Sequence, residues 1–320
     1  MKILVTGAAG YIGSVTTRLL LEAGHEVVAY DNLSHGYQDA IPKGVRFINA
    51  SIDQLAQHIT EADGIEAVVH LGAFIAAGES MQKPELYWQN NTVQTIAMLN
   101  DMRTLSIRKL IFASTAAVYG NPAEIPITED SPSNPTNTYG MTKLAMDMVI
   151  TSEAWGHGLA ATSVRFFNVA GAYKDSGERH PVETHLIPLA LQAAAGERDH
   201  LSLFGTDYDT KDGTCVRDYI HVIDLAQAML LALEKLEPGK HTIYNLGNGN
   251  GFTNREVIDA VRRVTGKDVK VVEEARREGD PATLIASSER AQKELGWKPR
   301  RPNLDDIVAD AWSFMTRGTA

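Results

Sequence analysis

Short β-branched, apolar runs alternate with amphipathic segments through the first half of the chain. The segment that begins near Tyr11 repeats apolar residues at helical spacing, and Gly24 is suited to end it. Six runs are predicted to be strands: 2–5, 26–30, 45–48, 67–71, 109–113 and 161–164. This alternation predicts a parallel, doubly wound sheet with right-handed crossovers, and strands this apolar suit a sheet covered on both faces.

The pattern changes after about residue 168. We expect a strand followed by a helix that Asp224 caps, together with these further elements: helices over 184–195 and 253–264, and strands over 201–204, 242–245 and 269–273. The sequence therefore predicts an α/β protein with two interleaved parts. The sheet domain is predicted over 1–168, with about 217–247 returning to it, and a smaller α/β substrate-binding lobe over 169–320.

Composition limits the partners of this chain. It has 320 residues, 44% of them hydrophobic, and a formal net charge of −10, which disfavours nucleic acid and anionic membranes but not a small anion held by local arginines. Cys215 is the only cysteine, which excludes an internal disulfide and fits a reducing compartment. With no signal-peptide core and no run of about 18 apolar residues, we expect a cytoplasmic protein.

Three glycines, Gly7, Gly10 and Gly13, lie between the first predicted strand and the first predicted helix. Gly7 permits a tight turn, Gly10 lets a pyrophosphate approach the backbone, and Gly13 lets helix and strand pack closely. Asp31 ends the second predicted strand, where a carboxylate can accept from both adenosine ribose hydroxyls and repels a 2′-phosphate. The pattern predicts a Rossmann-type site for NAD rather than NADP; a purely structural glycine turn is the alternative.

Tyr139 and Lys143 are four residues apart in a predicted helix, so they share a face. The Lys143 ammonium and the positive nicotinamide ring of oxidised NAD both favour the phenolate of Tyr139, which can take a proton from a hydroxyl as hydride leaves the same carbon. Thr115 ends the fifth predicted strand, at the edge of the sheet where such folds bind ligands. Its hydroxyl can orient the reacting oxygen or pass the proton of that oxygen to Tyr139. We predict that these three residues are catalytic; a chance Tyr-x-x-x-Lys pattern is the alternative.

Motifs along nearly the whole chain carry a family resemblance. They are the glycine run 6–13, Thr115 with the Tyr139–Lys143 pair, and the segments 78–80, 165–168, 212–222, 244–247 and 276–280. Together they resemble the extended short-chain dehydrogenase/reductases, and within them the NAD-dependent 4-epimerases of nucleotide sugars. The Tyr–Lys pair marks only the superfamily, whereas the segments around Arg217 and Arg277 are more specific.

The resemblance implies a reaction without net redox change. Tyr139 deprotonates the sugar 4-hydroxyl as C4 gives its hydride to NAD, the 4-keto sugar turns about its link to the diphosphate, and the hydride returns to the opposite face. Tight binding of the UDP part, which is remote from the reacting carbon, holds the substrate in the site while the sugar turns. The implied activity interconverts UDP-galactose and UDP-glucose.

By position in the matched motifs, the resemblance implies two sets of binding residues. Those for NAD are Gly7, Gly10, Tyr11, Ile12, Gly13, Asp31, Asn32, Ser51, Ile52, Leu71, Gly72, Ala73, Asn91, Ala113, Tyr139, Lys143 and Phe166. Those for the UDP-sugar are Thr115, Tyr139, Asn168, His185, Leu186, Phe204, Arg217, Tyr219, Arg277 and Asp280. Arg217 and Arg277 clamp the diphosphate, where a guanidinium fork suits phosphate oxygens; a surface ion pair between Arg217 and Asp218 is the structural alternative. No metal ligand is expected.

The chain departs from the family pattern at several positions. Ser51 stands where many members have an aspartate toward adenine, and Ile75 stands where some have a lysine near the cofactor. Leu284 aligns with a gate position whose size affects acceptance of N-acetylated sugars. Dehydratases of this superfamily use an acid–base pair after the strand-end threonine, and Ala116 and Ala117 cannot transfer a proton, which argues against that reaction.

Several alternatives stay open. Epimerases of UDP-GlcNAc or UDP-GalNAc, of UDP-pentoses and of UDP-uronates differ in few atoms of substrate, and a noncatalytic sensor is disfavoured because the Tyr–Lys pair is intact. Relatives dimerise through helices that flank the sheet, so we predict a homodimer through 84–105 and 139–152. Four apolar residues lie either at that interface or in the core: Leu86, Val93, Ile96 and Met146.

Overall fold

The computed structural model of the chain describes residues 1–277 and 279–317. Seven parallel strands form the central sheet, in the spatial order β12-β6-β5-β4-β1-β2-β3. In chain order these strands are β1 (Lys2–Thr6), β2 (Glu26–Asp31), β3 (Arg46–Asn49), β4 (Ala67–His70), β5 (Lys109–Thr115), β6 (Ala160–Phe166) and β12 (His241–Leu246). The strands predicted in the first half are confirmed with small shifts at their ends. Glu278 and residues 318–320, parts of predicted segments, lie outside the described residues.

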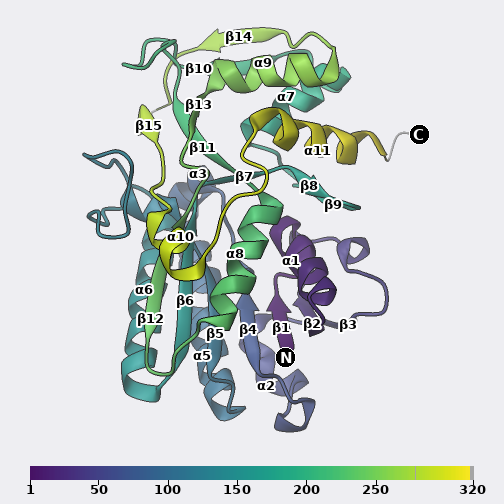
Figure 1. Cartoon of the computed structure of the whole chain (residues 1–320), viewed down its shortest axis with the longest axis vertical. Coiled ribbons are helices and arrows are strands. Elements are labelled where there is room, and N and C mark those ends of the chain that lie inside the picture. The colour runs from purple at the N-terminus through teal and green to yellow at the C-terminus, as the bar shows by residue number, and fades with distance from the viewer. Residues whose placement is uncertain (278, 318–320) are drawn as a thin grey trace.

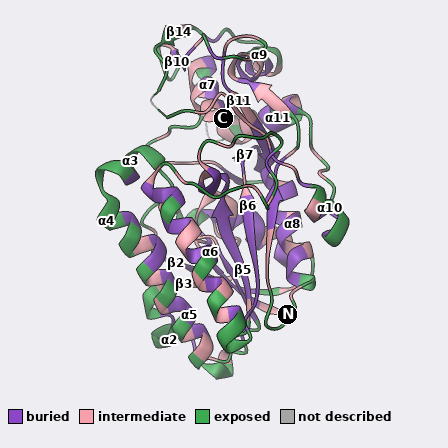
Figure 2. Ribbon diagram, turned by 90° about the vertical axis from the view of Figure 1, so that its left-hand side faces the viewer, coloured by how far each residue is buried: buried purple, intermediate pink, exposed green. Residues whose placement is uncertain are grey.

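Helices cover both faces of the sheet. On one face α1 (Tyr11–Glu22) packs against α8 (Val222–Glu234), and on the other lie α2 (Leu55–His58), α5 (Gln94–Thr104) and α6 (Thr138–His157). The shorter helices beside these layers are α3 (Ala77–Gln82), α4 (Pro84–Tyr87) and α10 (Glu289–Leu295). Figure 2 shows the buried strands between the layers, with α5 and α6 at the left and α8 at the right. Within the described ranges, no helix is both long and apolar enough to cross a membrane.

Strand β1 divides its side chains between two apolar cores. Ile3 and Val5 pack into the core that includes Leu225 of α8, whereas Leu4 packs into the opposite core with Met146 of α6. These β1 side chains have no exposed surface. A continuous apolar run is what a strand covered on both faces requires, so the predicted doubly wound sheet is confirmed.

The strand order determines where ligands can bind. From β3 the order runs β3-β2-β1-β4-β5-β6, the Rossmann order, with β12 added beside β6. The chain moves outward in one direction from β1 to β3 and in the other from β4 to β6, so the carboxyl ends of β1 and β4 flank a crevice. Because ligands of such sheets bind at this switch point, the turn after β1 and the loop after β4 are placed at the site.

A smaller α/β unit lies beyond the carboxyl ends of the sheet strands (Figure 1). Its strands are β7 (Asn168–Ala170), β8 (Ala172–Tyr173), β9 (Ser176–Gly177), β10 (Leu201–Phe204), β11 (Val216–His221), β13 (Gly251–Thr253), β14 (Val271–Glu274) and β15 (Thr283–Leu284). Its helices are α7 (Leu186–Ala195), α9 (Asn254–Thr265) and α11 (Leu304–Arg317). Strand β11 pairs with β7, β13 and β15, while β10 pairs with β14. The three helices bury a shared core that contains Ile187, Val257 and Ile307.

The cap predicted for α8 is wrong. The His221 side chain, not that of Asp224, accepts a hydrogen bond from the Ile223 amide and caps the helix. The carboxylate of Asp224 instead accepts from the backbone amides of Arg300 and Arg301, at 2.8 and 2.9 Å. A residue in the first turn of a helix can serve a distant segment, and sequence spacing alone does not distinguish the two roles.

The segment 84–105, which is predicted to take part in a dimer interface, is not one continuous α-helix. A π-helical stretch, Trp88–Val93, separates α4 from α5. Met146 of α6 is fully buried, which places it in the core rather than at an interface. The other candidate interface residues are exposed: Leu86, Val93 and Ile96.

Candidate functional site

The turn between β1 and α1 has the geometry that the glycine spacing predicts. Gly7 has a φ of +72°, and a Cβ on it would lie 2.5 Å from the Gly72 nitrogen. A Cβ on Gly13 would lie 1.9 Å from the Gly7 carbonyl oxygen, so any larger residue would separate α1 from the strand. Beside Gly10 the space is open, since a Cβ there would meet only the Gly7 carbonyl oxygen among the described atoms. The backbone at Gly10 can therefore be approached closely by a ligand.

Asp31 lies where β2 ends, next to that turn. Its carboxylate accepts from the Ala9 amide at 3.0 Å and from the Leu33 amide at 2.7 Å. Burial raises the pKa of Asp31, and the two amide hydrogen bonds oppose that rise. Two donors leave further lone-pair positions on the carboxylate, which can accept from hydroxyl groups of a ribose.

Asn91 supports the loop that follows β4, the loop of the predicted cofactor residues Leu71, Gly72 and Ala73. Its side-chain oxygen accepts from the Phe74 amide, and its nitrogen donates to the Phe74 carbonyl, both at 2.9 Å. Asn91 is buried, so its visible role is to position this loop. Contact between Asn91 and the cofactor phosphates stays a prediction.

Ser51 carries an orphaned hydroxyl. It follows β3, and its Oγ is buried without a hydrogen-bond partner in the described part of the chain. The Ser51 backbone is held in place, because its carbonyl accepts from the Tyr30 hydroxyl at 2.8 Å. A buried hydroxyl without a partner fits a site completed by a ligand with polar edges, such as adenine. Ile75 is exposed and offers no polar contact.

The other predicted cofactor residues have varied surroundings. The Tyr11 hydroxyl is buried and donates to the Gly171 carbonyl at 2.6 Å. Ile12 and Phe166 pack, partly buried, against the core. Asn32 is exposed, and its side-chain oxygen accepts from a nearby backbone amide at 3.0 Å. Ile52 is half-buried at the turn after β3.

Helix α6 presents Tyr139 and Lys143 to the carboxyl end of β5. Asn137 caps the helix by accepting from the Gly140 amide at 2.9 Å, and both Tyr139 and Lys143 are buried. Lys143 Nζ donates to the Ala113 carbonyl at 2.8 Å, which ties the helix to the strand. Thr115 ends that strand, and its hydroxyl lies close enough to Tyr139 to lower the pKa of the Tyr139 phenol. The structure therefore brings the three predicted catalytic residues together.

Burial governs the protonation of the pair. It raises the pKa of Tyr139 to about 12, although the Thr115 hydroxyl lowers it, and it reduces the pKa of Lys143 to about 7, although Asp147 opposes that change. Sequence reasoning emphasised the attraction between ammonium and phenolate. In the folded protein the loss of hydration around each charged form is the largest effect on each pKa, because both side chains are buried.

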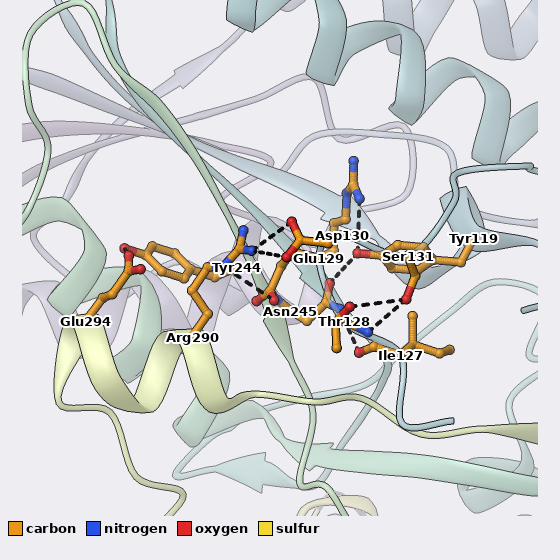
Figure 3. A network of polar contacts seen from close by, with 11 residues as sticks. Tyr119, Ile127, Thr128, Glu129, Asp130, Ser131, Tyr244, Asn245, Arg290 and Glu294 are labelled. Atoms are coloured by element: carbon orange, nitrogen blue, oxygen red, sulfur yellow. Dashed lines mark hydrogen bonds and ion pairs between the residues drawn. The ribbon is translucent and has the colours of Figure 1, made fainter. Parts of the chain in front are cut away.

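A polar network holds the loop between Thr115 and Tyr139 (Figure 3). Asn245 of β12 is its centre: its amide donates to Glu129 at 2.8 Å, its Nδ2 donates to the Ile127 carbonyl at 3.0 Å, and its Oδ1 accepts from the Tyr119 hydroxyl at 2.7 Å. Sequence reasoning did not find this network, because it joins segments more than a hundred residues apart.

A cleft in the smaller unit collects most of the residues predicted for the UDP-sugar. Those that line it are Asn168, His185, Leu186, Phe204, Arg217, Tyr219, Arg277 and Asp280. The Arg277 guanidinium lies over the Phe204 ring, 4.0 Å from its centroid. Arg217 Nη1 donates to the Pro281 carbonyl at 2.8 Å, and its Nη2 lies 3.7 Å from Asp280. Two guanidinium groups in one cleft suit a diphosphate.

The ion pair between Arg217 and Asp218, the structural alternative, does not form. Asp218 is buried and accepts from the amides of Asn248, Gly249 and Ala286 at 2.6 to 3.1 Å. Burial raises the pKa of Asp218 to about 6, although the three amides lower it. Neighbouring residues of a strand point to opposite faces, so Arg217 and Asp218 serve different surroundings.

Sequence analysis missed one cluster of side chains. Glu178, His180, Glu183 and His185 each present a ligand-type atom, and these atoms lie within 4.8 Å of one another. The signal for this cluster in the sequence is the alternation Glu-x-His-x-x-Glu-x-His between β9 and α7.

A switch-point crevice with a proton-transferring pair at one strand end is typical of enzymes that use a dinucleotide for hydride transfer. A sequence profile of the NAD dependent epimerase/dehydratase family matches residues 3–247. The chain therefore belongs to the NAD dependent epimerase/dehydratase family.

Individual relatives agree over almost the full length. The chain is 52% identical over 314 residues to a UDP-glucose 4-epimerase of Corynebacterium glutamicum, covering 98% of this chain and 95% of the relative. It superposes on a UDP-glucose 4-epimerase of Brucella ovis in complex with NAD with a TM-score of 0.93 and 40% identity, covering 98% of each chain. For the Bifidobacterium longum enzyme in complex with NAD+ and UDP, the TM-score is 0.92 and the identity 33%, covering 100% of this chain and 99% of the other.

Proposed function

We propose that this protein interconverts UDP-galactose and UDP-glucose by NAD-dependent epimerisation at C4 of the sugar. One observation carries the proposal: the buried Tyr139–Lys143 pair stands at the end of β5 beside Thr115, in a chain with 52% identity to a UDP-glucose 4-epimerase. The cleft with Arg217 and Arg277 supplies the anionic binding that a UDP-sugar needs.

The residues present fit NAD. The open backbone at Gly10 and the N-terminus of α1 can hold the pyrophosphate, Asp31 can accept from the adenosine ribose, and the orphaned Ser51 hydroxyl can complete an adenine contact. When bound there, NAD supplies a reversible hydride acceptor for C4 of the sugar.

Proton transfer falls to residues of α6 and β5. Tyr139 takes the proton of the sugar 4-hydroxyl and later returns it, and Thr115 orients the reacting oxygen. Lys143 acts through position and charge: held on the Ala113 carbonyl, it stabilises the phenolate of Tyr139 whenever that forms. Burial favours the neutral phenol, which cannot accept a proton, so Tyr139 acts as the base only where the charged Lys143 and the positive nicotinamide ring of oxidised NAD lower its pKa.

The nucleotide end is held apart from the chemistry. Arg217 and Arg277 bind the diphosphate, Phe204 packs beside the uracil, and Asp280 accepts from the uridine ribose. Tight binding there leaves the sugar free to turn about its bond to the diphosphate, so that either face of C4 can be presented.

Replacement Tyr139→Phe tests the proposal. Epimerase activity should fall by at least about 100-fold while UDP still binds, because the cleft is untouched. Tyr173→Phe, which removes a phenol that donates to Glu22 at the end of α1, is the matched control and should keep wild-type activity. Unchanged activity of Tyr139→Phe would remove this residue from the mechanism.

The sugar is tested separately with UDP-galactose, UDP-GlcNAc, UDP-xylose and UDP-glucuronate. We expect turnover of UDP-galactose. Leu284 pairs with Arg217 in the β11–β15 register, so it lies in the same sheet as the arginine proposed to bind the diphosphate. From there its side chain can limit the binding of UDP-sugars that carry an N-acetyl group. Turnover of UDP-xylose and UDP-glucuronate alone would reject the hexose assignment.

We further propose a cytoplasmic homodimer. The exposed apolar side chains on the helices over 84–105 and on α6 are Leu86, Trp88, Val93, Ile96, Met141, Met148 and Trp155. Exposed apolar groups on adjacent helices favour contact with another protein surface. The acidic composition and the single buried cysteine, Cys215, fit the cytoplasm.

A further inference from the structure

The loop between β9 and α7 gathers four side chains with metal-ligand chemistry. Glu178, His180, Glu183 and His185 point their ligand atoms to one spot, all within 4.8 Å of one another. The carboxylates are nearly buried, with 9% and 8% of the Glu178 and Glu183 side chains exposed. These four residues are called the Glu–His cluster below.

The spacing of the Glu–His cluster fits a tetrahedral ion. His180 Nδ1 lies 3.2 Å from a Glu178 oxygen and 3.5 Å from a Glu183 oxygen. His185 Nδ1 lies 2.9 Å from Glu178 and 2.8 Å from Glu183. Ligands about 2.0–2.1 Å from a zinc ion at the centre of a tetrahedron are separated by about 3.4 Å. Glu178 Oε1 faces both imidazoles, whereas Glu183 presents Oε2 to His180 and Oε1 to His185, and all the ligand atoms lie within 4.8 Å of one another, so an ion would draw them closer together.

Hydrogen bonding leaves part of the cluster unsatisfied. His180 Nδ1 is buried and has no hydrogen bond of acceptable geometry among residues 1–277 and 279–317, although carboxylate oxygens are close. The alternative is that both imidazoles carry charge and pair with the carboxylates. In that state the carboxylates of Glu178 and Glu183 face both imidazoles, and their attraction outweighs the repulsion between rings whose centroids are 5.2 Å apart. A divalent cation between neutral imidazoles gives the same total charge without that repulsion.

We propose that Glu178, His180, Glu183 and His185 form a binding site for a divalent transition-metal ion, with Zn²⁺ as the expected occupant. Imidazole nitrogens and carboxylate oxygens are both ligands that zinc accepts. Mg²⁺ demands oxygen ligands in octahedral geometry and does not suit two imidazoles.

The place of the Glu–His cluster indicates what an ion would do there. Glu178 and His185 also line the UDP-sugar cleft, and His185 directly precedes the first turn of α7. An ion that joins Glu178 to His185 would cross-link the loop 178–185 and hold its backbone against the cleft. The site is therefore structural, since four protein ligands leave no open position for a substrate.

The test uses the full-length, untagged protein after treatment with a chelator. Co²⁺, a spectroscopic substitute for zinc, is titrated and visible absorption is recorded; Zn²⁺ is then added in competition, and Mg²⁺ serves as the negative ion. We expect about one Co²⁺ per chain with the intense visible bands of a tetrahedral site, displaced by Zn²⁺ and unaffected by Mg²⁺.

Two variants decide which residues bind. His180→Gln should weaken Zn²⁺ binding by more than about 100-fold, beyond what loss of an outer-shell partner costs. His157→Gln, at an exposed histidine at the end of α6, is the matched control and should bind as the wild type does. If His180→Gln fails to fold, Glu183→Gln is compared in the same way. No uptake of Co²⁺ by the wild type, or equal affinity in the wild type and the ligand variants, would overturn the proposal.

A second readout rests on the proposed function. Chelator treatment should raise the KM for UDP-galactose several-fold with little change in kcat, and Zn²⁺ should restore it, because the ion orders the nucleotide cleft and not the reacting carbon. Failure of the proposed function would abolish turnover altogether but would leave the Co²⁺ spectrum unchanged, so the two failures are distinguishable.

Discussion

Lys143 Nζ lies 2.8 Å from the carbonyl oxygen of Ala113, across the junction of α6 and β5. This hydrogen bond sets the rotation of α6 against the sheet, and therefore the position of Tyr139 beside Thr115. Lys143 is buried in this position, and the loss of hydration around its ammonium changes how the stability of the protein depends on pH.

Replacement of Lys143 by Met should change how stability depends on pH. Burial lowers the pKa of Lys143 in the folded protein from 10.5 to about 7. Between these values the unfolded chain binds more protons, so the free energy of unfolding of the wild type rises with pH there, by up to about 1.4 kcal/mol per pH unit. Below pH 7 the cost of burying the charged lysine is fully present.

Lys143→Met lacks this contribution, so its stability relative to the wild type should fall as the pH increases from about 7 to about 10. Urea unfolding at several pH values measures the difference. Lys240→Met, at an exposed lysine, is the control and should follow the wild type. A difference that is constant across this pH range would contradict the prediction.

Asp31→Asn should weaken the preference for NAD over NADP. The carboxylate is held by the Ala9 and Leu33 amides, and Asn keeps an acceptor for one of them while removing the charge. Loss of charge-assisted hydrogen bonds to the ribose should lower NAD affinity about 10- to 100-fold. NADP binding should change much less, because its 2′-phosphate no longer meets a negative group.

Titration calorimetry with each dinucleotide measures both affinities. Asp39→Asn, at an exposed carboxylate that pairs with Arg179, is the matched control and should bind NAD as the wild type does. If Asp31→Asn retained the full preference for NAD, the carboxylate would not be the group that recognises the ribose.

Arg277→Gln should affect binding more than chemistry. Arg277 lies over Phe204 in the cleft, so its loss removes a charge from the predicted diphosphate clamp. We expect the KM for UDP-galactose to rise about 10- to 100-fold, with a smaller change in kcat. Steady-state kinetics separates the two effects.

The neighbouring arginine provides the control for this experiment. Arg276 pairs with Asp207 at the surface and stacks on Tyr208, so Arg276→Gln should leave KM within about threefold of the wild type. Equal effects of the two substitutions would argue against a specific role for Arg277.

Val93→Asp should dissociate the proposed homodimer. Val93 is 50% exposed in the π-helical stretch, next to Ile96 of α5, and a carboxylate there would lose hydration in a dimer interface. Light scattering at low micromolar concentration should show dimers for the wild type and monomers for the variant, with unchanged circular dichroism. A wild-type protein that is already monomeric at this concentration would reject the interface.

Where sequence reasoning succeeded, the signal was local. The strands of the first half follow from hydrophobic periodicity, and the four-residue spacing of Tyr139 and Lys143 predicts that they share one face of a helix. The tight turn at Gly7 follows from a backbone conformation that only glycine adopts without strain. Such features depend on residues within a few positions of one another, so a single sequence contains the required information.

Where it failed, the outcome depended on distant partners. The position of Asp224 in the sequence would allow it to cap α8, but its carboxylate accepts hydrogen bonds from the amides of Arg300 and Arg301 instead. Asp218 could pair with Arg217, but the loop at 248–249 approaches it from another part of the chain. The spacing of residues along the chain does not predict such contacts between distant segments.

The amino-acid sequence by itself determined the alternation of strands and helices, the dinucleotide turn and the identity of the Tyr139–Lys143 pair, because periodicity and backbone geometry are local properties. Only the tertiary structure decided that burial controls the protonation of that pair, that Asn245 holds the loop between Thr115 and Tyr139, and that the Glu–His cluster converges on one point. Each of these depends on the packing of segments far apart in the chain or on the exact path of a loop, which hydrophobic patterning does not encode.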